Sequence, residues 1–195
     1  RESVPDCYAD LGFRTVSTNP CGEIPLCPYD SCRLLAINLY SYVDKPFTKE
    51  ASFNFDKFRR HVAAAMRMMD DIIDLELEKV EAILEKISKD PEDEDIRQVE
   101  VKLWEKIREK ALQGRRTGLG ITAEGDMLAA LGLRYGTDEA TDFAVEIQKT
   151  LAVEAYRTSV KMAQERGKFP IYDAGREEGN PMIERIKEAD PALYE

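Results

Sequence analysis

The sequence contains little of what many catalytic and binding classes require. Its 195 residues include one histidine, His61, so a Cys–His or Ser–His couple would depend on a single imidazole. No apolar run approaches the roughly 18 residues that cross a bilayer, and no signal peptide opens the chain. Acidic residues outnumber basic ones by 38 to 28. Because phosphate contacts need a surplus of Lys and Arg, we expect binding neither to nucleic acid nor to a membrane.

Cysteine is also scarce, with four residues in the chain. Three of them lie between positions 21 and 32, a pattern that does not resemble the disulfide framework of a small secreted protein and favours a reducing cytoplasm. The gaps between Cys21, Cys27 and Cys32 fit none of the common zinc spacings, and Cys7 adds no recognisable iron–sulfur pattern. We therefore expect no metal site, and we interpret Cys7 and Cys27 as buried, unreactive thiols.

The ends of the sequence indicate a piece of a longer polypeptide. The first residue is Arg1 rather than Met, and the chain stops at Glu195 without a recognisable ending. With 43% hydrophobic residues, the chain can supply one good-sized core or a large part of a bigger one. We expect residues 1–195 to be a single segment of a larger protein.

One stretch brings three chemically different side chains together. Asn19, Cys21 and Glu23 alternate along a segment that Pro20 and Gly22 keep out of a helix. Alternate residues of an extended chain point the same way, so a donor, a sulfur and a proton acceptor can face one spot. His61 falls within an expected helix, where we place it on the polar face. A thiol beside an amide and a carboxylate, with no imidazole base, suits hydrogen-atom abstraction coupled to proton transfer.

Apolar periodicity predicts strands separated by helices. Apolar residues recur at three- and four-residue steps from Phe55 to Ile87, which is typical of a long amphipathic helix. Asp90 suits an N-cap and Pro91 the first position of a second helix that Gly114 ends, giving an antiparallel helical hairpin over about 55–114. The other expected elements are strands at 13–17, 32–43 and 116–122 and helices at 123–131, 137–167 and 181–189.

This order of elements indicates an α/β fold with mostly parallel strands. The strand at 32–43 is long and apolar enough to be largely buried. The second helix of the hairpin should have one apolar stripe, made of Ile96, Val99, Leu103, Ile107 and Ala111.

Gly118 and Gly120 invite comparison with a dinucleotide-binding fingerprint. Ala123 stands where the third glycine of that pattern is expected, and no acidic residue closes a second strand about 20 residues later. Close packing of a strand against a helix is the better interpretation of the two glycines.

Two blocks of sequence then stand in a definite order. The first comprises Thr18–Glu23 (TNPCGE), Pro28–Tyr29 and Ser31–Leu39 (SCRLLAINL). The second comprises Arg115–Thr122 (RRTGLGIT), Gly125–Ala129 and Leu133–Ala140. Together they resemble the active-site segment of the catalytic chains of ribonucleotide reductases, and Asn-Pro-Cys-Gly-Glu resembles the class II, adenosylcobalamin-dependent branch.

The resemblance implies a fold and a set of roles. The fold would be part of a ten-stranded α/β barrel with a central finger loop that carries the radical cysteine, Cys21. Glu23 would accept a proton and Asn19 would hydrogen-bond the ribose, within a substrate-binding segment formed by Asn19, Pro20, Cys21, Gly22 and Glu23. Cys32 would be one thiol of a redox-active pair whose partner lies outside this segment.

The resemblance also implies the partners of the complete enzyme. These are a ribonucleoside di- or triphosphate substrate, adenosylcobalamin, a thioredoxin-type reductant and deoxynucleotide effectors bound elsewhere on a cytoplasmic homodimer, in an enzyme that serves DNA synthesis. We expect the isolated segment to be inactive. Two alternatives stay open: a segment of a class I large subunit, and a helical assembly module in which Cys21 and Cys32 are structural.

Overall fold

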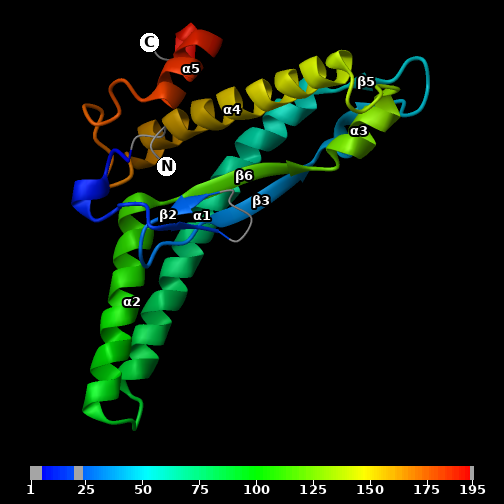
Figure 1. The fold of residues 1–195 in the computed structure, drawn as a ribbon. Helices are drawn as coiled ribbons and strands as arrows, with labels where there is room; N and C mark the ends of the chain where they lie inside the picture. The colour runs from blue at the N-terminus through cyan, green and yellow to red at the C-terminus, as the bar shows by residue number, and fades with distance from the viewer. Residues whose placement is uncertain (1–5, 20–23, 194–195) are drawn as a thin grey trace. The chain divides into compact units, whose positions relative to one another are not determined.

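The computed structural model describes residues 6–19 and 24–193 (Figure 1). In these ranges the chain forms five α-helices and six short strands, joined by loops and three 3₁₀ turns. The helices are α1 Phe55–Ser88, α2 Glu94–Gly114, α3 Glu124–Leu131, α4 Asp138–Arg166 and α5 Pro181–Ala189. The strands are β1 Ser17–Thr18, β2 Pro25–Leu26, β3 Arg33–Asn38, β4 Val43–Asp44, β5 Ser52–Phe53 and β6 Thr117–Thr122. The 3₁₀ turns are η1 Ala9–Leu11, η2 Leu39–Tyr42 and η3 Pro191–Leu193.

The chain divides into two compact units. The first contains residues up to 33, 69–118 and 166–181, and the second contains residues 34–68, 119–165 and 182 onward. Helix α1 contributes its first part to the second unit and its remainder to the first.

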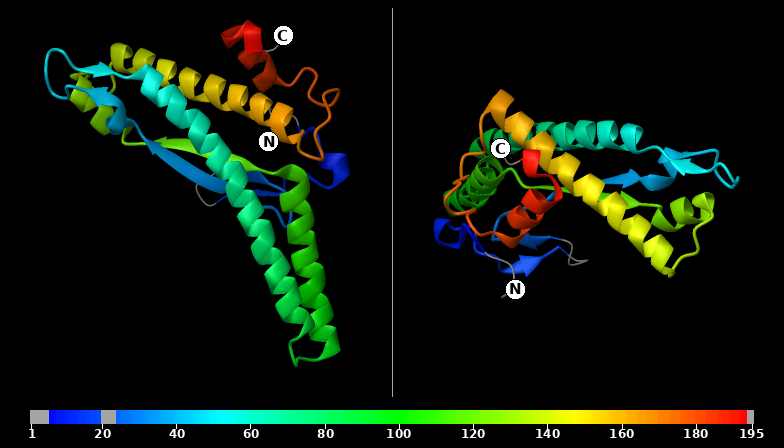
Figure 2. Two further views of the ribbon diagram at one scale, coloured as in Figure 1. Left: turned by 180° about the vertical axis from the view of Figure 1, so that it is seen from behind. Right: turned by 90° about the horizontal axis from the view of Figure 1, so that it is seen from above.

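The second unit is organised around a parallel strand pair. β3 pairs with β6, and the two run side by side in the same direction (Figure 2). Parallel neighbours need a long crossover, and the helices α1 and α2 supply it. The apolar core of this unit comes from β3, η2, α1, α3 and α4, and its buried members are Ile37, Leu39, Tyr42, Phe58, Val62, Ala65, Met127, Leu128, Ala140, Ile147 and Leu151.

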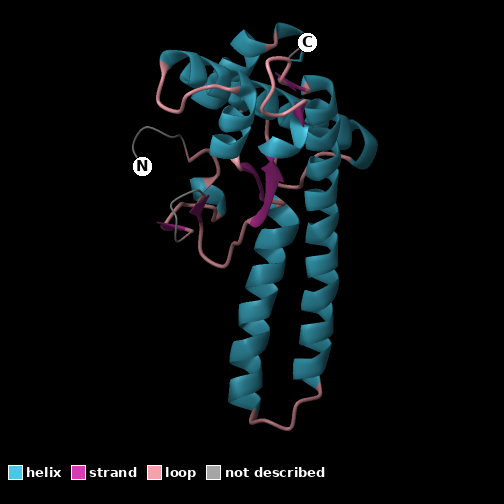
Figure 3. Cartoon of the chain, turned by 90° about the vertical axis from the view of Figure 1, so that its right-hand side faces the viewer, coloured by secondary structure: helices cyan, strands magenta, loops and turns pink. Residues whose placement is uncertain are grey.

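The first unit contains the helical hairpin. The C-terminal part of α1 runs beside α2 in the opposite direction (Figure 3). Met69, Ile73, Val80 and Ile87 of α1 are buried along one stripe, as the periodicity predicted. Arg115, which caps α2 in a left-handed conformation, forms ion pairs of 2.7 and 2.8 Å with carboxylates of α1. Residues 69–114 thus contain two antiparallel helical segments within the first unit.

Most predicted helix boundaries are also confirmed. α3 ends at Gly132, whose φ of +78° is the left-handed geometry that glycine adopts without strain. α4 begins after Thr137, whose hydroxyl accepts a hydrogen bond from the N–H of Ala140 at 3.3 Å. It ends before Gly167, where φ is +88°. Within the described residues, no helix is long and apolar enough to span a membrane.

The predictions for α2 were partly wrong. The helix is capped at Asp93 and starts at Glu94, so Pro91 lies in the connecting turn rather than at the first helical position. In the apolar stripe of α2, Ala111 is buried, whereas Val99 is 69% exposed, and Ile96 and Leu103 are exposed as well. A period of 3.6 shows that a helix has an apolar face, but it does not show which neighbour covers that face.

The strand predictions also needed correction. The strand expected at 13–17 is reduced to β1, which starts at Ser17. The strand expected at 32–43 ends at Asn38, whose side chain accepts the N–H of Tyr40 and starts a 3₁₀ turn. β3 alternates in burial, with Leu34 58% exposed, so it is not buried on both faces. The pairs β1–β2 and β4–β5 are antiparallel, which contradicts the expectation of mostly parallel strands. The described strands form three two-stranded sheets and no closed barrel.

Candidate functional site

The segment singled out in the sequence is bracketed by a small antiparallel hairpin. Ser17 of β1 pairs with Leu26 of β2, and Thr18 pairs with Pro25. The N–H of Asn19 donates to the carbonyl of Ile24 at 3.0 Å. This pairing holds Asn19 and Ile24, at the two ends of the segment, next to each other.

Asn19 is the one member of the predicted catalytic set that the structure describes. It is partly exposed at the end of β1. Pro20, Cys21, Gly22 and Glu23 lie outside the described residues. The convergence of Asn19, Cys21 and Glu23 on one spot therefore stays a prediction.

A first arginine clamp holds the C-terminal side of this hairpin. The Arg116 Nε lies 2.8 Å from an oxygen of Asp30, whose side chain is 1% exposed. The Nη1 of Arg116 donates to the carbonyl of Pro25 at 3.3 Å. The other oxygen of Asp30 accepts the N–H of Ser31 at 2.9 Å. Since a buried carboxylate is costly unless it is paired and hydrogen-bonded, this arrangement fixes the turn between β2 and β3.

Cys27 lies in that turn and is buried. Its Sγ is 3.6 Å from the Asp30 carboxylate, to which it donates. Burial, followed by the negative charge of Asp30, raises the pKa of the Cys27 thiol to about 11. Burial also raises the pKa of Cys7, in part together with the charge of Glu177. Both thiols are therefore poor nucleophiles near neutral pH, in agreement with their interpretation as unreactive.

A second arginine clamp surrounds Cys32. Cys32 is partly buried directly before β3, and its Sγ donates to the carbonyl of Arg33 at 3.7 Å. Arg33 is 7% exposed, and its Nε lies 2.5 Å from an Oε of Glu76 on α1. The Nη1 of the same guanidinium donates to the carbonyl of Ser31 at 2.9 Å. The residues on both sides of Cys32 are thus tied to the ion pair between the buried Arg33 and the partly exposed Glu76.

The sequence interpretation missed the residues that make these clamps. Arg33 and Arg116 lie inside the two blocks that carry the family resemblance, but neither received a role. Asp30 and Glu76 gave no separate signal, because an acidic residue in a turn or on an amphipathic helix is ordinarily solvated. The signal that could have marked Arg33 is a basic residue at the start of an apolar strand.

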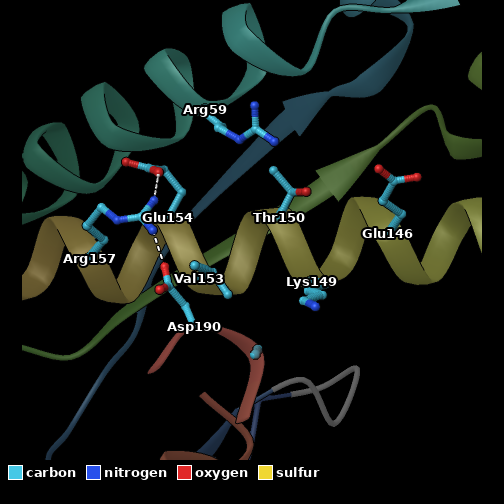
Figure 4. A pocket seen from close by; sticks show the side chains of 9 residues that line it. Arg59, Glu146, Lys149, Thr150, Val153, Glu154, Arg157 and Asp190 are labelled. Carbon is cyan, nitrogen blue, oxygen red and sulfur yellow. Dashed lines mark hydrogen bonds and ion pairs between the residues drawn. The ribbon is translucent and has the colours of Figure 1, made fainter. Parts of the chain in front are cut away.

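Other charged side chains line a hollow elsewhere in the second unit. It measures about 310 Å³, and Arg59, Lys149 and Arg157 face it together with acidic side chains (Figure 4). Arg157 is already bonded to Glu154 and Asp190, so its charge is compensated. A hollow of about 450 Å³ in the first unit is lined by the facing ends of α1 and α2. Neither is lined by Asn19 or Cys32, and the described residues contain no cluster of His, Cys, Asp or Glu suited to a metal ion.

His61 lies on the exposed side of α1, as predicted. Its Nδ1 is 3.0 Å from the hydroxyl of Tyr42. Tyr42 belongs to the core of the second unit, whereas Cys32 and Asn19 belong to the first. The histidine therefore has a structural partner.

Fold and site together define the chain as a mixed α/β segment in which a short hairpin brackets a cysteine motif and two arginine clamps fix the strand connection that follows. The family model for the ribonucleotide reductase barrel domain matches residues 12–190. The chain belongs to that family, which confirms the resemblance seen in the sequence.

Relatives of known name refine this assignment. The chain is 33% identical over 156 residues to a vitamin B12-dependent ribonucleoside-diphosphate reductase of Thermoplasma acidophilum, covering 80% of this chain and 17% of that protein. It is 31% identical over 163 residues to a protein of the same name from Mycobacterium tuberculosis H37Rv, covering 84% of this chain and 19% of that protein. A ribonucleoside-diphosphate reductase subunit alpha of Chlamydia pneumoniae is 25% identical, with 82% of this chain and 13% of that protein covered. The chain thus spans less than a fifth of the length of these relatives.

Proposed function

We propose that the chain is the active-site segment of an adenosylcobalamin-dependent ribonucleotide reductase. The observation that carries this proposal is the family match over residues 12–190, which includes the Asn19–Glu23 motif and both clamps. Relatives named for vitamin B12 are 31–33% identical to the chain, whereas those named without it are 23–26% identical. These names favour the cobalamin-dependent branch over a class I large subunit, and they favour a ribonucleoside diphosphate as the substrate.

The proposed chemistry uses the residues of the bracketed segment. Adenosylcobalamin supplies the initial radical when it is bound to the complete enzyme. Cys21, as a thiyl, takes the hydrogen atom from C3′ of the ribose, and Glu23 accepts the proton of the 3′-hydroxyl. Asn19 hydrogen-bonds the ribose, and the 2′-hydroxyl leaves as water. Cys21 then returns the hydrogen atom to C3′.

Cys32 and a partner cysteine outside this segment supply the reducing equivalents. Two thiols become one disulfide, and the two hydrogens they lose replace the C2′–OH bond with C2′–H and complete the water molecule. The balance is one ribonucleotide and two thiols consumed, and one deoxyribonucleotide, one water and one disulfide formed. A thioredoxin-type dithiol then reduces the disulfide.

Binding of the cofactor is assigned to other parts of the complete protein. The two hollows described above are too small for a corrinoid, and charged side chains line most of their walls. We therefore attribute no cobalamin contact to a residue of this segment.

The finer architecture also belongs to this proposal. The parallel pair β3–β6 would supply two neighbouring strands of a ten-stranded barrel, and the β1–β2 hairpin would form the base of its finger loop. Deoxynucleotide effectors, the homodimer contact and a cytoplasmic location would be properties of the complete chain.

The proposal is tested by assaying the complete protein with a ribonucleoside diphosphate, a dithiol and adenosylcobalamin. We expect deoxyribonucleotide formation that depends on the cofactor and needs no second subunit. A requirement for a separate metallo-subunit, with no response to adenosylcobalamin, would assign the chain to class I instead.

A further inference from the structure

Arg33 combines deep burial with an incomplete set of partners. Its Nε contacts Glu76 and its Nη1 contacts the carbonyl of Ser31, at 2.5 and 2.9 Å. Its Nη2 is buried and has no hydrogen-bond partner among the described residues. The guanidinium is therefore paired once with a carboxylate and once with the backbone, and its buried Nη2 has no partner among the described residues.

Stability alone does not account for this arrangement. Arg33 is buried, whereas the side chain of Glu76 is 30% exposed, so the guanidinium loses its hydration without a fully buried counter-charge. Its buried Nη2, which has no partner among the described residues, adds a further desolvation cost. A residue retained at such a cost is best explained by what it contacts, and Arg33 contacts the residue that precedes Cys32.

We propose that Arg33 is a positioning residue for Cys32, holding the Ser31–Cys32–Arg33 backbone so that the Cys32 thiol meets its partner cysteine in disulfide geometry. This inference rests on the redox role proposed for Cys32. The ion pair with Glu76 holds the guanidinium of Arg33 against α1, and the same planar guanidinium donates to the Ser31 carbonyl.

Disulfide formation makes positioning important at this site. The Cβ atoms of two bonded cysteines lie about 3.5–4.5 Å apart, and the torsion about the S–S bond is confined near ±90°. A backbone that can rotate at Ser31 raises the free energy of the disulfide without changing either thiol. In the step concerned, Cys32 and its partner lose two protons and two electrons as the S–S bond forms, and an oxidised glutathione or the ribonucleotide accepts them.

The unused Nη2 donor fits the same role. Nearly all buried donors in proteins are paired, so an acceptor from outside the described residues is expected here. The segment that carries the partner cysteine must approach Cys32, which is the neighbour of Arg33. A backbone carbonyl of that segment would then accept a hydrogen bond from the Nη2 of Arg33.

Two variants of the complete, cofactor-free protein separate positioning from stability. Arg33→Lys keeps a positive charge for Glu76 but loses the fork that reaches Ser31. Glu76→Gln keeps the fork but leaves the buried guanidinium without a counter-charge. Each is equilibrated with glutathione redox mixtures, and the Cys32 disulfide is quantified by mass spectrometry. Urea unfolding of the same samples measures stability.

We expect Arg33→Lys to require about a tenfold more oxidising glutathione ratio for half-formation of the disulfide. Glu76→Gln should stay within about twofold of the wild type in this ratio, although it unfolds at a lower urea concentration. Arg67→Lys is the matched control, because Arg67 makes a similar fork to Glu165 at 2.7 Å with no cysteine beside it. It should leave the disulfide equilibrium unchanged.

The inference is overturned if Arg33→Lys needs the same glutathione ratio as the wild type for half-formation of the disulfide. It is also overturned if Glu76→Gln shifts that ratio more than Arg33→Lys does, because the disulfide equilibrium would then follow stability. Failure of the proposed function itself gives a different result. In that case no Cys32 disulfide forms in the wild type under any glutathione ratio, or Cys32→Ser still produces deoxyribonucleotide with the wild-type yield.

Discussion

At the scale of single residues, the site is defined by buried charge. Asp30 and Arg33 are almost fully withdrawn from solvent, and each is paired with a partner far away in sequence. Removing one partner of a buried pair leaves an uncompensated charge, which costs about 3–5 kcal/mol. The connection from β2 to β3, which includes Cys27 and Cys32, is therefore held more rigidly than its loop character suggests.

The unreactive role assigned to Cys27 can be tested by its dependence on pH. Because the pKa of Cys27 is raised to about 11 from 9.0, its thiolate fraction at pH 8 should be about a hundredfold lower than that of an ordinary cysteine. We expect alkylation of Cys27 in the native protein to rise with pH up to a midpoint near 11, as measured by peptide mass spectrometry.

The same protein unfolded in urea provides the control for this measurement, because the thiol then loses both its burial and the neighbouring Asp30. Its alkylation midpoint should return to near 9. A native midpoint at or below 9 would show that Cys27 is an activated thiol, in conflict with the unreactive role assigned to it.

Sequence reasoning singled out some of these residues and not others. Cys21, Glu23 and Asn19 were recognisable because a motif places them at alternate positions. The pairing of Arg33 with Glu76 joins residues 43 positions apart, and the pairing of Arg116 with Asp30 spans 86 positions (116 minus 30). Local spacing contains no information about such contacts, since they depend on how α1 and β6 lie against the turn.

At the scale of elements, the two helices of the hairpin differ in what their apolar residues do. α1 buries a continuous stripe, whereas α2 exposes Ile96, Val99 and Leu103 in its N-terminal half. Periodicity predicted both helices correctly, and it predicted the buried stripe for α1. For α2 the period shows an apolar face but not which part of that face is covered.

This difference in burial predicts a large loss of stability when an α1 side chain is shortened and a small change when an α2 side chain is shortened. Ile73 of α1 is completely buried, so Ile73→Ala should lower the free energy of unfolding by about 3 kcal/mol through lost burial and a new cavity. Val99→Ala should change it by less than about 0.5 kcal/mol, because the side chain is 69% exposed and alanine favours helix. Urea unfolding of the 195-residue chain measures both values.

Comparable losses in the two variants would contradict this description of the hairpin. They would mean that Val99 is covered, for example by a second copy of the chain. Dependence of the Val99→Ala effect on protein concentration would identify that second copy as the cause.

At the scale of the whole molecule, the chain matches less than a fifth of the length of its curated relatives. The match covers 17–19% of the length of the relatives named for vitamin B12, and the proposed partner thiol lies outside the chain. Inactivity of the isolated segment therefore stays an expectation. The resemblance predicted part of a ten-stranded barrel, whereas the described residues form three strand pairs. A closed barrel needs more strands than the six described here.

The central claim concerns Cys21, and replacing it in the complete protein tests that claim most directly. The measurement is release of tritium from a ribonucleoside diphosphate labelled at C3′, together with deoxyribonucleotide formation, in the presence of adenosylcobalamin and a dithiol. Cys27→Ser serves as the matched control, because it replaces a thiol six positions away that the proposed reaction does not use.

The proposal predicts that Cys21→Ser abolishes both tritium release and product, since a serine hydroxyl does not replace the thiol as the carrier of the radical. Cys27→Ser should retain both. Residual deoxyribonucleotide formation by Cys21→Ser, at a rate comparable to that of Cys27→Ser, would contradict the assignment of Cys21 as the radical carrier.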